Sequence, residues 1–260
     1  MAEAFAVPPL TSGSYAFFFD LDGTLAEIQP HPDMVVIPPD VIQALQQLSA
    51  LSNGALALIS GRSMEELIRL SQPLRLPLAG VHGAERRDIN GKVVRIALDD
   101  NIRQELRVTL SGAVKELSGV RLEDKGNAFA LHYRDNPSRH QEVMDLASRC
   151  VASGQDLSLQ PGKLVVEIKP AGASKGSALE SFMATAPFSG RTPLFIGDDL
   201  TDEDGFAAVN RLNGVSIKVG EGTTQARYRL KNVPAVWQWL KSQVQANTPS
   251  FVTPEKRNRP

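Results

Sequence analysis

The chain has 260 residues, enough for one large domain or for a core with an inserted lobe. Its 28 basic and 29 acidic residues leave a net charge of −1, so the composition points to neither a nucleic-acid nor a membrane partner. No apolar run approaches the roughly 18 residues of a membrane helix, and the start lacks the basic and apolar regions of a secretory signal. One cysteine, Cys150, excludes an intrachain disulfide. We therefore expect a soluble cytoplasmic protein, whose protein partners the sequence does not indicate.

The first predicted element is a buried strand, Tyr15 to Phe19, which ends at two acidic residues. Residues 1–14 are rich in Pro, Ser and Gly and are predicted to form a loose arm before it. The apolar, aromatic run is typical of a strand in a parallel sheet. Asp20 and Asp22 follow, and carboxylates crowded against an apolar sheet lose solvation and repel one another. We therefore expect a bound cation, and Mg²⁺ suits because it takes carboxylate, water and phosphate oxygens.

A tight turn and a second strand come next. Gly23 permits the chain to turn behind the acids, and Thr24 supplies a hydroxyl close by. After a helix predicted over residues 41–51 from its apolar spacing, Ala55 to Ile59 forms a second buried strand. Ser60 then stands at the end of this strand, where the two acids stand on the first strand.

The segment after Ser60 allows a structural and a functional interpretation. Ser63 with Glu66 three residues later predicts a capping box, which would explain the segment by helix capping alone. Both interpretations can hold, with Ser63 capping the helix and Ser60 facing a phosphate. Residues 77–80 then predict a short strand, and residues 83–97 predict a hairpin about Asn90-Gly91. The roles of His82 and Glu85 stay open.

From residue 97 to residue 169 the pattern changes to helix, hairpin, helix, hairpin. The helices are predicted over 101–117 and 138–152, and the hairpins over 120–134 and 157–168. This antiparallel α+β pattern is set inside an α/β pattern, so we interpret it as an inserted domain.

The strands of this insertion have one apolar and one polar face. By period-two alternation, Glu123 and Lys125 share one face of their strand with Arg121, and Glu167 shares a face with Lys163 and Lys169. An ordinary solvated sheet face would look the same. If the insertion is a lid, Glu123, Lys125 and Glu167 are our candidates for binding sugar hydroxyls, because such groups donate and accept hydrogen bonds.

The last third of the chain carries a second acidic cluster. Lys175 is the first residue of a predicted helix. A cation is mildly unfavourable in the first turn of a helix, so a lysine at this position supports a functional role. An apolar strand then ends at Asp198 and Asp199, and Thr201 is predicted to cap a helix with Asp202 in its first turn. Residues 246–260 are predicted to form a second loose tail.

The two acidic clusters together predict one metal site. Either cluster alone could be an acidic turn that closes a strand. In an open parallel sheet, however, ligands gather at the carboxyl ends of the strands near a topological switch point. Asp20 and Asp198 are therefore expected to be neighbours in space although they are 178 residues apart in the sequence.

These motifs resemble a known family. Asp20-Leu-Asp22-Gly-Thr24, Ser60-Gly-Arg62, Lys175 and Gly197-Asp-Asp-x-x-Asp202 are similar to the four ordered motifs of the haloacid dehalogenase (HAD) superfamily of phosphotransferases. Residues 80–85, 172–176 and 197–204 resemble, more narrowly, the trehalose-6-phosphate phosphatase family. The resemblance implies an α/β, Rossmann-like core over 1–96 and 170–260, with helices on both faces of a parallel sheet, and an α+β cap of the C2 type over 97–169.

The resemblance also implies residue roles. Mg²⁺ would be held by Asp20, Asp198 and the backbone carbonyl of Asp22, with Asp199 or Asp202 supporting the ligands from one layer further out. Asp20 would attack phosphorus to form an aspartyl phosphate, and Asp22 would act as general acid and base. The phosphate would be bound by a third group of residues, Thr24, Ser60 and Lys175.

The implied activity is Mg²⁺-dependent hydrolysis of trehalose 6-phosphate. Two alternatives stay open from the residues alone. The residues of the core motifs recognise the phosphate and do not distinguish between sugars. A phosphatase or mutase for sucrose phosphate or mannose phosphate therefore fits them too. A binding protein without catalysis is the other, although such a protein would be expected to have lost one of the core residues.

Overall fold

The larger sheet of the protein carries the ends of both acidic segments. The computed structural model describes residues 7, 10, 14–152 and 156–247. Eight strands form this sheet in the order β12-β11-β10-β1-β2-β3-β4-β5. The strands from β12 to β3 run parallel, and β4 and β5 form an antiparallel hairpin. Their bounds are β1 Tyr15–Phe19, β2 Leu56–Ile59, β3 Leu78–Gly80, β4 Glu85–Arg87, β5 Val93–Arg95, β10 Thr192–Gly197, β11 Val215–Val219 and β12 Tyr228–Leu230.

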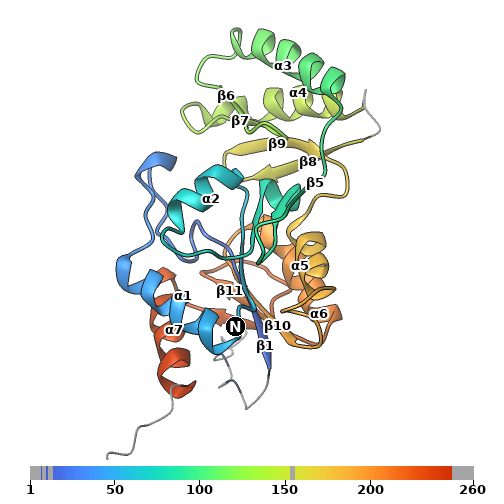
Figure 1. The fold of residues 1–260 in the computed structure, drawn as a ribbon. Coiled ribbons are helices and arrows are strands. Elements are labelled where there is room, and N and C mark those ends of the chain that lie inside the picture. The colour runs from blue at the N-terminus through green and yellow to red at the C-terminus, as the bar shows by residue number, and fades with distance from the viewer. Residues whose placement is uncertain (1–6, 8–9, 11–13, 153–155, 248–260) are drawn as a thin grey trace, which may run out of the picture.

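Strand β1 is central because its side chains are apolar on both faces. Phe17 and Phe19 pack into a core shared with α1 (Pro39–Leu51), α2 (Met64–Leu70) and α7 (Val233–Asn247). Ala16 and Phe18 point to the opposite face, into a core shared with α5 (Lys175–Met183) and α6 (Glu203–Arg211). Figure 1 shows α1 and α7 on one side of the sheet and α5 and α6 on the other. The expected doubly covered parallel sheet is present.

The strand order places a topological switch point beside β1. From β1 the chain moves to β2 and β3 in one direction, whereas the later strands β10, β11 and β12 continue in the other. β1 pairs directly with β10, with Phe19 opposite Ile196. The carboxyl ends of these two strands therefore open at the same edge of the sheet, where ligands bind in folds of this kind.

A second sheet of four strands lies beyond that edge. Its order is β6-β7-β9-β8, with β6 Arg121–Asp124, β7 Phe129–His132, β8 Leu157–Gly162 and β9 Val165–Pro170. Phe129 and Ile168 pack against α3 (Asp100–Val114) and α4 (His140–Ala152). In Figure 1 these two helices lie on the side of the small sheet that faces away from the rest of the molecule. The polar face of the small sheet is therefore the one that faces the larger sheet.

Some predicted bounds differ from the structure. The helix predicted over 101–117 ends at Val114, and the strand β12 was not predicted. The loose tail predicted from residue 246 is wrong for residues 246 and 247, because α7 runs to Asn247. Residues 248–260 lie outside the described residues, as does most of the arm predicted over 1–14.

None of the helices among the described residues combines the length and the apolar character needed to cross a membrane.

Candidate functional site

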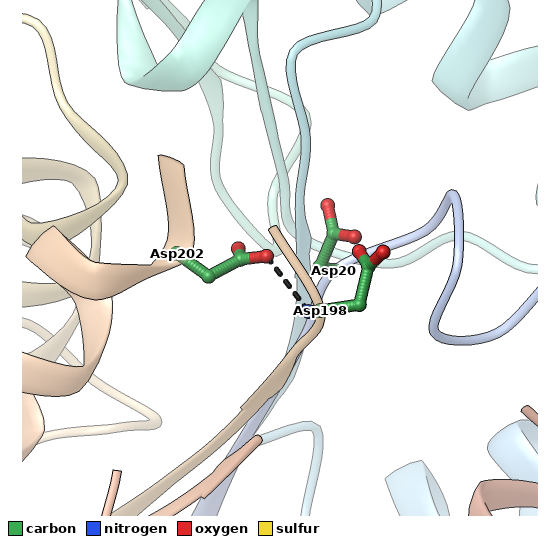
Figure 2. A group of neighbouring side chains, drawn as sticks. All are labelled: Asp20, Asp198 and Asp202. Atoms are coloured by element: carbon green, nitrogen blue, oxygen red, sulfur yellow. Dashed lines mark hydrogen bonds between the residues drawn. The ribbon is translucent and has the colours of Figure 1, made fainter. Parts of the chain in front are cut away.

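Three aspartates converge at the switch point. Asp20 follows β1, Asp198 follows β10, and Asp202 lies at the end of the short 3-10 turn Leu200–Asp202. One carboxylate oxygen from each lies within 4.8 Å of the others, as Figure 2 illustrates. Gly23 allows the approach, since a Cβ atom there would lie 2.2 Å from Asp198 Oδ2. The predicted meeting of the two acidic segments is present in the structure.

Asp202 lies in a short 3-10 turn and not in the first turn of an α-helix, where the sequence predicted it. It is fully buried, and its Oδ2 accepts hydrogen bonds from the backbone N–H groups of Asp198 and Asp199 at 2.9 Å. The predicted cap Thr201 is wrong, because it lies inside the 3-10 turn and α6 begins only at Glu203. Asp202 therefore shapes the turn that carries Asp198, and the turn brings its carboxylate into the cluster.

Lys175 links two of the three aspartates. Ser174 caps α5 in a capping box with Ser177, which fixes the first turn that carries Lys175. The Lys175 ammonium group lies 2.7 Å from Asp20 Oδ1 and 2.6 Å from Asp202 Oδ1. Burial opposes this charge, but the two carboxylates raise the pKa of Lys175 above its usual range. A lysine that is 3 % exposed therefore stays charged at the centre of the site.

The cluster holds more negative charge than its lysine can balance. Burial, together with Asp202 and Asp198, raises the pKa of Asp20 well above its usual value, against the effect of Lys175. Burial and Asp202 raise the pKa of Asp198 to about 7. Asp198 Oδ1 is buried and has no hydrogen-bond partner among the described residues. These three crowded carboxylates fit a hard metal ion, which would supply the missing positive charge and a partner for that oxygen.

Asp22 lies beside the cluster but is held by another residue. Its carboxylate accepts hydrogen bonds from Arg62 Nε at 2.7 Å and from a terminal nitrogen of Arg62 at 2.8 Å. Arg62 also donates to Glu66, which forms the predicted capping box of α2 with Ser63. The Asp22 side chain is thus separate from the three converging carboxylates. Arg62 belongs to the motif Ser60-Gly-Arg62, but its contact with Asp22 was not predicted.

Two predicted phosphate-binding hydroxyls lie next to the cluster. Thr24 is fully buried and donates a hydrogen bond to Asp20 Oδ2 at 3.4 Å. Ser60 follows β2, is 2 % exposed, and accepts a hydrogen bond from the backbone N–H of Arg62 at 3.2 Å. A further lysine that was not predicted, Lys218 on β11, donates to the backbone carbonyl of Asp198. The sequence could have indicated Lys218, because it lies on the predicted strand that follows the one ending at Asp198.

The three predicted sugar-binding residues lie on the polar face of the small sheet. Lys125 Nζ donates to Glu167 Oε1 at 2.6 Å and to the backbone carbonyl of Gly61 at 2.9 Å. Glu123 contacts His132 Nε2 at 2.7 Å. Burial opposes the charge of Glu167, but Lys125 and then His82 lower the pKa of Glu167. The side chains of Lys125 and Glu167 are buried, at 8 % and 7 % exposure, so the solvated-face interpretation is wrong for these two residues.

One cavity of about 760 Å³ joins both parts of the site. Its wall includes the acidic end of the larger sheet and the polar face of the small sheet. A cavity of this size accommodates a small-molecule ligand. Among the predicted site residues, those that line it are Asp20, Asp22, Ser60, Glu123, Lys125, Glu167, Lys175, Asp198 and Asp199.

Comparison with known proteins agrees with this geometry. The family model described as trehalose-phosphatase matches residues 18–234. The chain is 57% identical to a trehalose-6-phosphate phosphatase of Escherichia coli over 93% of this chain and 91% of the relative. It is 44% identical to a probable trehalose-phosphate phosphatase of Sinorhizobium fredii, over 80% of this chain and 78% of the relative.

Solved structures agree in fold. The C-terminal domain of trehalose-6-phosphate phosphatase from C. albicans matches with a TM-score of 0.80 at 21% identity, covering 94% of this chain and 99% of that one. A phosphatase of the haloalkanoate (HAD) enzyme superfamily from Bacteroides thetaiotaomicron matches with a TM-score of 0.61 at 18% identity, covering 92% of this chain and 98% of that one. The predicted HAD fold is confirmed.

Proposed function

This chain belongs to the trehalose-phosphatase family, and from that membership we propose that it hydrolyses trehalose 6-phosphate to trehalose and inorganic phosphate in trehalose biosynthesis. The observation that carries the proposal is the convergence of Asp20 and Asp198 in the wall of a cavity that is also lined by Glu123, Lys125 and Glu167. The cavity thus offers groups that can bind a phosphate and groups that can bind a sugar.

In the first half of the reaction, Asp20 is the nucleophile. One oxygen of its carboxylate forms a bond to phosphorus while the bond from phosphorus to the sugar oxygen breaks, and the electron pair of that bond goes to the sugar oxygen. Asp22 donates a proton to this oxygen, so that trehalose leaves as a neutral alcohol. Lys175 lies 2.7 Å from Asp20, and Ser60 and Thr24 lie close by, which supports a role in holding the phosphate oxygens.

In the second half, water removes the phosphate from Asp20. Asp22 now takes a proton from the attacking water as the water oxygen forms a bond to phosphorus. The bond between phosphorus and Asp20 breaks, and its electron pair returns to the carboxylate. One residue thus serves as acid and then as base, which its place beside the cluster and outside it supports.

We propose Mg²⁺ as the metal ion of this site. Asp202 already uses both oxygens for Lys175 and two backbone N–H groups, so Asp20, Asp198 and the backbone carbonyl of Asp22 are the proposed ligands. Asp202, and Asp199 next to it, would support these ligands from behind. The chemistry that Mg²⁺ supplies when bound is to offset the repulsion between the phosphate oxygens and the Asp20 carboxylate.

Metal binding is testable without turnover. At a concentration about one hundred times its Kd, Mg²⁺ is expected to stabilise the protein by about 2.7 kcal/mol, which raises the Tm by roughly 5–10 °C. Asp198→Asn is expected to lose most of this rise, because it removes the negative charge and one of the two oxygens of a carboxylate that lacks a partner at Oδ1. Thermal unfolding of both proteins, with KCl at equal ionic strength as the control, measures the difference. An equal rise in the variant would contradict the ligand assignment.

We further propose that residues 97–169 act as a cap domain on a catalytic core formed by 1–96 and 170–260. The separate four-stranded sheet with its own core of α3 and α4 supports this division. Closure of the cap over the core would exclude water from the reaction and would bring the sugar-binding residues of the cap into contact with the substrate. A cytoplasmic location also stays a prediction, supported by the single cysteine.

Glu123→Ala is expected to separate sugar recognition from phosphate chemistry. The variant should lower kcat/KM for trehalose 6-phosphate by about 10-fold or more, since a charged hydrogen bond is lost, and should spare p-nitrophenyl phosphate. Asp124→Ala is a matched control, because the next residue on β6 contacts Arg107 of α3 instead of the cavity. Equal losses on both esters would argue against a role of Glu123 in the cap.

The sugar is the part of the proposal that most needs a direct test. Phosphate release from a panel of trehalose, sucrose and mannose phosphates, with and without Mg²⁺, should give the highest kcat/KM for trehalose 6-phosphate. A higher value for another sugar phosphate would replace the substrate, and no release from any ester would favour a binding protein.

A further inference from the structure

The turn between β3 and β4 has an unusual backbone. Val81, His82 and Gly83 have positive φ angles of 48°, 52° and 97° in succession. Positive φ is costly for a β-branched residue such as valine and persists only where the surroundings enforce it. All three residues are buried. Such strain is found more often at functional sites than elsewhere, so the contacts of this turn are informative.

The strained turn is packed against the loop that carries Ser60. The backbone N–H of His82 donates to the Ser60 carbonyl at 3.0 Å, and the N–H of Val81 donates to the Arg62 carbonyl at 2.8 Å. The His82 ring lies directly on Gly61, since a Cβ atom at Gly61 would be 2.6 Å from two of its atoms. The position of the ring is therefore fixed relative to Ser60.

The same turn is also packed against the start of α5. A Cβ atom at Gly83 would lie 2.6 Å from the backbone carbonyl of Ser174, the residue before Lys175. The turn is thus held between two of the segments that carry proposed phosphate-binding groups, Ser60 and Lys175. A side chain on this turn therefore has a fixed position relative to these proposed phosphate-binding groups.

His82 directs its ring at the small sheet. Its Nε2 lies 3.1 Å from Glu167 Oε2, while Lys125 contacts Glu167 Oε1 and the Gly61 carbonyl. Two residues of the larger sheet's loops, Gly61 and His82, therefore meet two of the small sheet. All four line the cavity. Glu167 therefore has a neighbour at each oxygen, with Lys125 at Oε1 and His82 at Oε2.

Glu167 keeps an unused acceptor. Among the described residues, neither its Oε2 nor His82 Nδ1 has a hydrogen-bond partner of good geometry, and both atoms are buried. Burial lowers the pKa of His82 against the effect of Glu167, and the Nε2 atom of the ring faces this carboxylate at 3.1 Å. Glu167 as a whole lines the cavity, and a carboxylate there has lone pairs that can accept a hydrogen bond from a hydroxyl.

We propose that His82 is a positioning residue for sugar recognition, which orients the carboxylate of Glu167 so that it accepts a hydrogen bond from a sugar hydroxyl. This inference rests on the proposed function and adds a core residue to a sugar site otherwise formed by the cap. Because the orientation exists before binding, the substrate does not have to order Glu167.

The test uses two substitutions in the full chain. Asn tolerates positive φ but is too short to reach Glu167, whereas the amide nitrogen of Gln stands about where His82 Nε2 stands. His82→Asn is expected to lower kcat/KM for trehalose 6-phosphate by about 10-fold to 50-fold and for p-nitrophenyl phosphate by less than about threefold. His82→Gln should recover activity to within about fivefold of wild type, and His31→Asn in an exposed loop is the control.

A double-mutant cycle with Glu167→Gln separates positioning from a general structural effect. In the Glu167→Gln background, His82→Asn is expected to cost less than about threefold, because the residue it positions is already impaired. Parallel losses on both esters, no loss with His82→Asn, failure of His82→Gln to recover activity, or independent effects in the cycle would each overturn the proposal. Should His82→Asn not fold, the cycle with His82→Gln decides. Wild-type protein that hydrolyses p-nitrophenyl phosphate but not trehalose 6-phosphate would instead refute the proposed substrate.

Discussion

Asp20→Asn is expected to reduce phosphate release by roughly 10⁴-fold or more, the scale of losing a nucleophile. Asn has nearly the same shape as Asp, but its amide cannot form an acyl phosphate that water then cleaves. The loss should affect trehalose 6-phosphate and p-nitrophenyl phosphate equally, since both pass through the same intermediate. Steady-state rates on the two esters measure it.

The fold should tolerate this change. Lys175 keeps its ion pair with Asp202, and the change removes one of three crowded carboxylates. The raised pKa of Asp20 reflects the cost of its charge when no metal is bound, so the Tm of the metal-free variant is expected to equal or exceed that of the wild type.

The intermediate itself offers a second measurement. Wild-type protein quenched in acid during turnover should carry one phosphoryl group on the peptide that contains Asp20, and the variant should carry none. Intact mass and peptide mass spectrometry detect the difference. Normal turnover by Asp20→Asn would eliminate a covalent step at this residue.

Asp22→Asn is expected to lower kcat by roughly 10²–10⁴-fold, the span of a lost general acid and base. In the structure Arg62 holds the carboxylate with two hydrogen bonds, so the side chain is oriented beside the reacting group. An amide cannot donate the proton that the sugar oxygen needs on leaving. With p-nitrophenyl phosphate the phosphoenzyme should form at a nearly normal rate, because p-nitrophenolate leaves without a proton.

The matched control for this variant is Asp40→Asn, at an exposed aspartate of α1 that pairs with Lys241, and neither residue lines the cavity. Rapid-quench measurement of phosphoenzyme formation and decay separates the two halves of the reaction. A variant that hydrolyses trehalose 6-phosphate within about threefold of wild type would assign the acid and base roles to another residue.

The parts of this protein that its sequence determined are those governed by local pattern. The apolar run before Asp20 predicted a buried parallel strand, and the run before Asp198 predicted another. Because parallel strands present their carboxyl ends at one edge, the meeting of these aspartates followed from the pattern. The capping box at Ser63 and Glu66 and the alternating faces of the strands in the insertion were equally local, and the structure contains them.

Only the tertiary structure decided how side chains from different segments pair. Asp202 was predicted as a residue in a helical first turn, yet a short 3-10 turn places its carboxylate against Lys175. Arg62 reaches Asp22 across 40 residues of chain, and His82 reaches Glu167 by way of a strained turn. Periodicity and capping are set by neighbours in the chain, whereas these contacts depend on where packing places distant loops, which no spacing of residues encodes.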